Sequence, residues 1–109
     1  MFEKRTNDRS PIELAASYGI GEDPRPDREA KINNISSGGL GLTLNNKMRI
    51  GENIELAIEL DTKDDIIVYA KVAWVNKNEH NQKFTIGVQI LEKEGPDYDR
   101  FLEFYNQQL

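Results

Sequence analysis

Apolar and polar residues alternate through most of the chain up to Leu91, which is the pattern of half-buried β-strands. The clearest case is residues 54–60, where every second residue is apolar and Glu55 and Glu59 face the other way. Residues 19–27 hold two prolines and two glycines and are expected to form a loop. We expect six strands, over residues 12–18, 28–35, 40–44, 54–60, 66–75 and 84–91. Short strands separated by turns predict an antiparallel sandwich or barrel.

The period of the pattern changes after Gly95-Pro96-Asp97, a combination that is typical of a helix start. Beyond it, apolar residues recur at helical spacing, and the sequence therefore predicts a C-terminal helix over residues 96–109. The favoured interpretation is that this apolar stripe packs on the barrel; the alternative is a helix that binds a partner. The stripe consists of Tyr98, Phe101, Leu102, Tyr105 and Leu109.

Length and composition bound the kinds of protein that this chain can be. Its 109 residues suit one domain, and the absence of cysteine excludes disulfides, thiolate zinc sites and thiol nucleophiles. A net charge of −5 argues against binding a nucleic acid polymer, but leaves room for a small anion held by a local cationic cluster. No segment resembles a signal peptide or an apolar membrane span. We expect a soluble, cytoplasmic protein that does not insert into a membrane.

Conventional catalysis has little support in the sequence. The one histidine, His80, lies in a polar stretch with no serine or cysteine nearby to activate. There is no cluster of metal ligands, and residues 61–65 lack the ligand spacing and central glycine of a calcium loop. We predict neither an enzyme nor a metal site.

Two short features remain. Arg5 and Arg9 lie four residues apart in a polar segment, residues 1–10, which is either a solvated terminus or a flexible cationic arm that orders on an anion. The stretch NISSGG, residues 34–39, is either a hairpin whose glycines take positive φ or a bare backbone that a ligand can approach. In the second interpretation Asn34 and Ser36 offer polar side chains from one face of a strand end.

Taken together, these two features resemble the PilZ domain family. The matching positions are Arg5 and Arg9 for an Arg-x-x-x-Arg motif, then Asn34, Ser36 and Gly39 for an Asp/Asn-x-Ser-x-x-Gly motif. The resemblance continues through Leu40, Gly51, residues 70–75 and 86–88, and the final helix. It implies a six-stranded antiparallel β-barrel over residues 11–95, preceded by the arginine arm and followed by the helix, in a single domain.

The resemblance also implies a function. Many PilZ domains are receptors for the bacterial second messenger cyclic di-GMP, a dianion with two guanines. Arg5 and Arg9 would wrap around this ligand, and Asn34, Ser36 and Gly39 would hold a guanine edge. Asp is commoner than Asn at position 34, and Asn cannot act as a charged acceptor for guanine. We expect an adaptor that orders its arm on binding and signals to an unidentified downstream protein, in processes such as motility or biofilm formation.

Several assignments stay open at this point. Lys4 precedes the first motif arginine, where the residue type is associated with binding one nucleotide or a stacked pair, so the protein is expected to be a monomer or a ligand-linked dimer. Ser37, Gly38 and Gly41 are expected to serve only the turn, with a ligand contact as the alternative for Ser37 and Gly38. Trp74 is assigned to the barrel core or rim, with ligand stacking as the alternative. The competing function is a PilZ protein-interaction module that binds no nucleotide.

Overall fold

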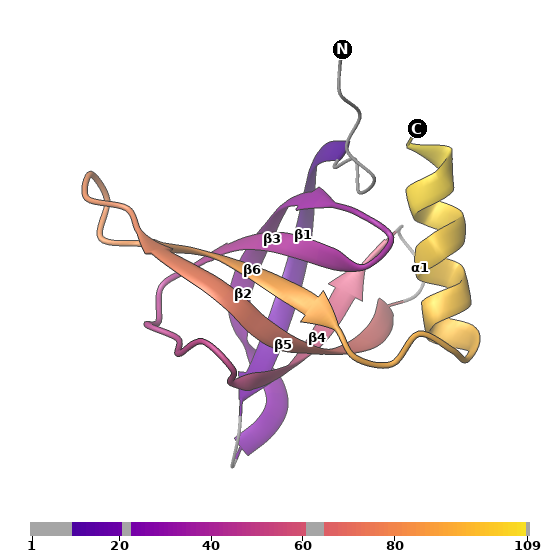
Figure 1. Cartoon of the computed structure of the whole chain (residues 1–109), viewed down its shortest axis with the longest axis horizontal. Coiled ribbons are helices and arrows are strands. Elements are labelled where there is room, and N and C mark those ends of the chain that lie inside the picture. The colour runs from indigo at the N-terminus through magenta and orange to yellow at the C-terminus, as the bar shows by residue number, and fades with distance from the viewer. Residues whose placement is uncertain (1–9, 21–22, 61–64, 109) are drawn as a thin grey trace.

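The computed structural model describes residues 10–20, 23–60 and 65–108 and consists of a closed antiparallel β-barrel with one helix (Figure 1). The strands follow one another around the barrel in the order β1-β2-β3-β6-β5-β4. This architecture confirms the predicted fold class. Its elements are β1 (Ser10–Ile20), β2 (Asp23–Ile35), β3 (Gly39–Leu44), β4 (Asn53–Glu59), β5 (Asp65–Lys77), β6 (Phe84–Ile90) and α1 (Pro96–Gln107).

The core lies inside the barrel and is built by the alternation seen in the sequence. In β4, Ile54, Leu56 and Ile58 are buried, whereas Glu59 is exposed. Because successive side chains of a strand point to opposite faces, this alternation aligns one apolar side of each strand with the barrel interior.

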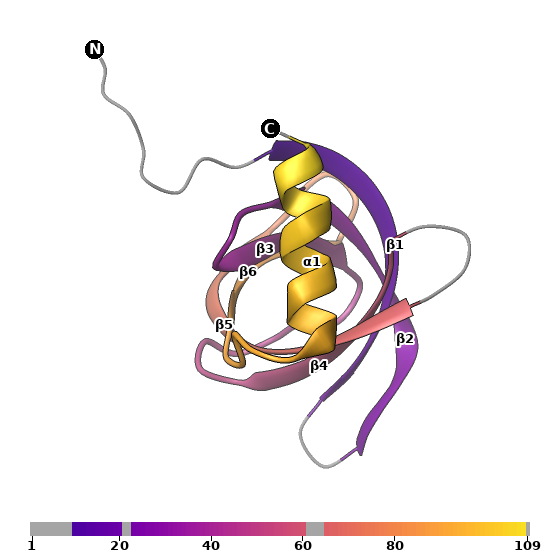
Figure 2. The same cartoon turned by 90° about the vertical axis from the view of Figure 1, so that its right-hand side faces the viewer.

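Helix α1 lies across one open end of the barrel (Figure 2). Phe101 and Tyr105 are buried in the same apolar cluster as the strands and Tyr98 packs against it, which confirms that the apolar stripe packs on the barrel; Leu109 lies outside the described residues. Asp97, expected as a first-turn acid of the helix, has a specific structural role: its Oδ2 accepts a hydrogen bond of 2.9 Å from the backbone N–H of Ile67 in β5. The helix start is thereby attached to the barrel wall.

The loop predicted over residues 19–27 is wrong for residues 19–20 and 23–27, because β1 extends to Ile20 and β2 starts at Asp23; residues 21–22 lie outside the described residues. Gly19 and Ile20 pair with Glu55 and Ile54 of β4, so a neighbouring strand holds the end of β1 extended. Pro24 and Pro26 are tolerated in β2 because, in the described part of the chain, β3 pairs with β2 only over residues 30–35, beyond both prolines. Proline lacks a donor and is compatible with a strand edge that has no such neighbour.

Apolar and polar residues alternate only weakly over residues 28–35, and this irregularity has a structural cause. The pairing of β2 with β3 shifts register between Ile32 and Asn34. Ile32 and Ile35 are both fully buried although they are three residues apart. The extra residue of this β-bulge leaves Asn33 and Asn34 side by side on the outer surface. The bulge therefore determines which polar side chains the barrel presents beside residues 36–39.

Candidate functional site

The turn between β2 and β3, residues 36–39, is tight and closed by its own hydrogen bonds. The backbone N–H of Ser36 donates to the carbonyl of Gly39 at 2.9 Å, and Ser36 Oγ donates to the same oxygen at 3.3 Å. Ser36 is only 4 % exposed. Its hydroxyl thus supports the turn from within.

The glycines of this stretch are not required for positive φ, contrary to the hairpin interpretation. Among the described residues, glycines with positive φ are Gly51 and Gly95. A Cβ at Gly39 would instead lie 2.5 Å from the backbone oxygen of Val88 in β6. Gly39 is therefore needed because the backbones of β3 and β6 approach closely at this point.

Contacts from β6 and α1 hold the turn in place. The N–H of Ile90 donates to the carbonyl of Gly38 at 3.0 Å, and Tyr98 Oη donates to the carbonyl of Ser37 at 3.0 Å. Burial, with a smaller contribution from the neighbouring Asp99 carboxylate, raises the pKa of the Tyr98 hydroxyl above its usual value of 10.0. Tyr98 therefore remains a neutral donor at physiological pH.

Beside the turn, one residue from each of four adjacent strands forms a row across the outer surface: Asn34, Gly41, Gly87 and Trp74. We call this set the cross-strand row. A Cβ at Gly41 would lie 2.8 Å from Asn34 Oδ1, and a Cβ at Gly87 would overlap the indole of Trp74. The Asn34 amide and the Trp74 indole thus lie over the two glycines. Because opposed Cβ positions are about 5 Å apart, the two side chains approach each other.

Two expectations change with this row. Trp74 does not belong to the core, since it is 41 % exposed and lies on the outside of the barrel. The cause is a second bulge, between Val72 and Trp74, which breaks the alternation of β5. Gly41 does not serve only the turn, since it leaves the space that the Asn34 side chain occupies.

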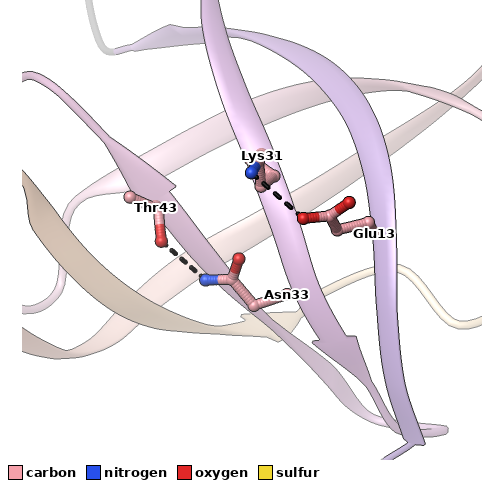
Figure 3. A network of polar contacts seen from close by, with 4 residues as sticks. All are labelled: Glu13, Lys31, Asn33 and Thr43. Carbon is pink, nitrogen blue, oxygen red and sulfur yellow. Dashed lines mark hydrogen bonds and ion pairs between the residues drawn. The ribbon is translucent and has the colours of Figure 1, made fainter.

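A groove of about 540 Å³, lined by both polar and apolar residues, lies on β1, β2 and β3 and the segment before β6, and no residue of the cross-strand row lines it. Figure 3 shows two of its contacts: Asn33 Nδ2 donates to Thr43 Oγ1 at 2.6 Å, and Lys31 Nζ lies 3.1 Å from Glu13 Oε2. Both partners of the ion pair are largely exposed, so the pair contributes about 0–1 kcal/mol to stability. The lining of the groove holds two lysines, Lys31 and Lys83, and two glutamates, Glu13 and Glu29, so its charged residues balance and offer an anion no net positive charge.

The predicted basic residues, Lys4, Arg5 and Arg9, lie outside the described residues. The place where their segment joins the barrel is described: Ser10, the first residue of β1, pairs with Ile35, directly before Ser36. The structure therefore brings together Asn34, Ser36, Ser37, Gly38 and Gly39, with the start of β1 next to them.

Sequence reasoning missed three residues of this surface. Gly87 was recognised within the segment Ile86-Gly87-Val88 but received no role, although it provides the space for Trp74. Tyr98 was assigned only to the apolar stripe, and its hydroxyl contacts the turn 61 residues away in sequence. Lys93 lies against Gly38, with its Nζ 3.6 Å from the position of a Cβ there. No local signal identifies these long-range contacts.

Within residues 10–20, 23–60 and 65–108, no group of three or more acidic or histidine side chains is arranged to hold a metal ion. In the same part of the chain, no helix has both the length and the apolar character needed to span a bilayer.

Several solved structures share this fold. The inhibitor of motility MotI/DgrA from Bacillus subtilis aligns with a TM-score of 0.75 and 19 % identity over 97 % of this chain and 51 % of its own. The PilZ domain of YcgR from Escherichia coli with c-di-GMP aligns with a TM-score of 0.71 and 12 % identity over 94 % and 88 %. The MrkH–c-di-GMP complex from K. pneumonia aligns with a TM-score of 0.71 and 16 % identity over 97 % and 52 %.

The chain thus spans about half the length of the MotI/DgrA and MrkH chains, and at these identities the similarity concerns the fold. No curated protein sequence matches significantly. A comparison with known families matches residues 3–107 to the PilZ domain, a binding and adaptor module. With nearly all of its residues matched, the chain belongs to the PilZ domain family.

Proposed function

We propose that this PilZ domain is a receptor for cyclic di-GMP and that the ligand binds on the outer surface of the barrel at residues 36–39 and the cross-strand row. The observation that carries the proposal is that the Asn34 amide lies over Gly41 and the Trp74 indole lies over Gly87, two glycines that pair across β3 and β6. An amide can hydrogen-bond to the edge of a guanine, and an indole can stack on its face. Two structurally similar proteins, YcgR and MrkH, were solved with c-di-GMP.

The N-terminal segment supplies the positive charge for the two phosphates in this proposal. Because Ser10 pairs with Ile35, the segment starts next to the turn. Five extended residues span about 17 Å, so both Arg5 and Arg9 are tethered within reach of a ligand on the turn. Each guanidinium can contact a phosphate or the O6 and N7 atoms of guanine in a bidentate manner.

The signal in this proposal is the ordering of the arm on the ligand, which creates a new surface for a downstream protein. The competing function is a PilZ interaction module without a nucleotide. The presence of both motif arginines, and of Asn34 and Trp74 in the same cross-strand row, favours the receptor.

Isothermal titration calorimetry with cyclic di-GMP tests the proposal. We expect the double variant Arg5→Ala/Arg9→Ala to bind at least tenfold more weakly than the wild type, because each charge-assisted contact contributes about 1.5–3 kcal/mol. Arg49→Ala, at an exposed position in the turn before β4, is the matched control and should bind normally. Trp74 is the chain's one tryptophan, so quenching of its fluorescence would report stacking directly.

Absence of binding by the wild type at high micromolar ligand would refute the receptor and favour the interaction module. Wild-type binding that the double variant retains would show that the arginines are not part of the site.

A further inference from the structure

Lys93, in the segment between β6 and α1, places its ammonium group at the turn of the candidate site. A Cβ built on Gly38 would lie 3.6 Å from Lys93 Nζ, and among the described residues, apart from the flanking ones, no other atom would be within 4 Å. The space that a side chain at position 38 would fill is therefore bordered by one positive charge. This segment lies 55 residues from the turn in sequence and carries no PilZ motif.

The position of Lys93 relative to the turn is held from both sides. Three residues earlier, the N–H of Ile90 donates to the carbonyl of Gly38 at 3.0 Å. Five residues later, Tyr98 Oη donates to the carbonyl of Ser37 at 3.0 Å. The chain around Lys93 is thus attached to the turn at two points, and the lysine does not reach it by a chance side-chain conformation alone.

The charge of Lys93 is not neutralised by the barrel. None of the described residues forms an ion pair with it, whereas Lys31 is paired with Glu13. The other described residues of the site, Asn34, Ser36 and Trp74, carry no charge. Among the described residues of the site, Lys93 is therefore the positively charged one that a dianionic ligand on this surface would contact.

We propose that Lys93 is an anion-binding residue of this site, which contacts a phosphate of the nucleotide at the turn in addition to the N-terminal arginines. A lysine ammonium is a compact charge with three donors and binds phosphate well without fork geometry. Glu92 and Glu94 flank Lys93 and would repel a polyanion, so this arrangement suits a small dianion better than a nucleic acid strand. The assignment rests on the proposed function.

Calorimetry of three variants with cyclic di-GMP at about 50 and 300 mM salt tests the assignment. Lys93→Gln should weaken binding by about threefold to tenfold at low salt and reduce the salt dependence of the affinity, because one screened charge contact is lost. Lys93→Arg, which keeps the charge, should restore most of the affinity. Lys83→Gln is the matched control. Lys83 is exposed and directly precedes β6, and the other end of this strand, which leads to Lys93, is about 20 Å from Lys83.

The possible results separate the two proposals. If the wild type binds and Lys93→Gln matches Lys83→Gln in affinity and salt dependence, the role of Lys93 is overturned and the receptor proposal is not. No binding by the wild type overturns the receptor and this role together. Selective weakening of Lys93→Gln, rescued by arginine, supports both.

Discussion

Gly87→Ala is the substitution that examines the cross-strand row most directly. A Cβ at this position would overlap the Trp74 indole, and the three atoms nearest to that Cβ all belong to Trp74. The indole must therefore leave the surface that it covers. Trp74 is the chain's one tryptophan, so its emission reports this movement without interference from a second indole.

The expected cost follows from the area that the indole covers. Trp74 is 41 % exposed, so roughly 60 % of it is in contact with the barrel. A buried aromatic covers about 150–250 Å², so roughly 120 Å² is at stake, or ~3 kcal/mol at about 25 cal/mol per Å². This is an upper limit, because the displaced ring covers other surface. Alanine is favoured over glycine in a strand by about 0.5–1 kcal/mol, which leaves a net destabilisation of about 1–2 kcal/mol.

Urea unfolding followed by far-ultraviolet circular dichroism measures this loss, and a cost of this size lowers the midpoint by roughly 1 M. Emission of the folded variant should shift to longer wavelength. The decisive control is Gly87→Ala in a Trp74→Ala background. There the methyl group has room, and the change should be neutral or stabilising by up to about 1 kcal/mol.

An unchanged midpoint and emission would refute the contact between Trp74 and Gly87. An equal cost in both backgrounds would show that the methyl group clashes with the backbone and not with the indole.

Two further substitutions address the ligand and the turn. Asn34→Asp should strengthen cyclic di-GMP binding roughly fivefold in calorimetry, since a charged acceptor contributes about 1 kcal/mol more to guanine N–H groups; weaker binding would contradict the assignment of Asn34 to a guanine edge. Tyr98→Phe removes the 3.0 Å bond to Ser37 and should cost about 0.5–1.5 kcal/mol in urea unfolding. Because burial raises the Tyr98 pKa above 10.0, the unfolded chain ionises first, and wild-type stability should fall as the pH rises past 10.0. The variant should lose less stability over this range. Tyr18, whose pKa is also raised by burial, contributes the same loss in both proteins. An equal loss of stability in the two proteins would argue against a buried Tyr98 hydroxyl.

Much of the barrel could be predicted because alternation is a local property. Strands such as β4 and β6 show their buried face in the sequence, and the final helix shows its stripe. Prediction was wrong where partner strands overrode local composition. Residues 19–27 have the composition of a loop, yet pairing of Gly19 and Ile20 with β4 supplies hydrogen bonds that keep the end of β1 extended.

The candidate site was predictable in part and for a different reason. Asn34, Ser36 and Gly39 were recognised by motif, but their individual roles depend on neighbours that are distant in sequence. Ser36 proves to be buried within the turn, and Gly39 is required by the backbone of Val88. Lys93 could not be assigned by any local pattern.

The sequence by itself determined the strand and helix content, the apolar interior and the position of the two family motifs, because all of these are properties of neighbouring residues. Only the tertiary structure decided which side chains share the outer surface. Closure of the barrel aligns Asn34, Gly41, Gly87 and Trp74 from four strands in one row, and the two bulges turn Asn34 and Trp74 outward. Packing of α1 on the barrel end then brings Tyr98 to the turn. Strand register and helix docking arise from contacts between distant segments, and for this reason the site emerges only when the chain is folded.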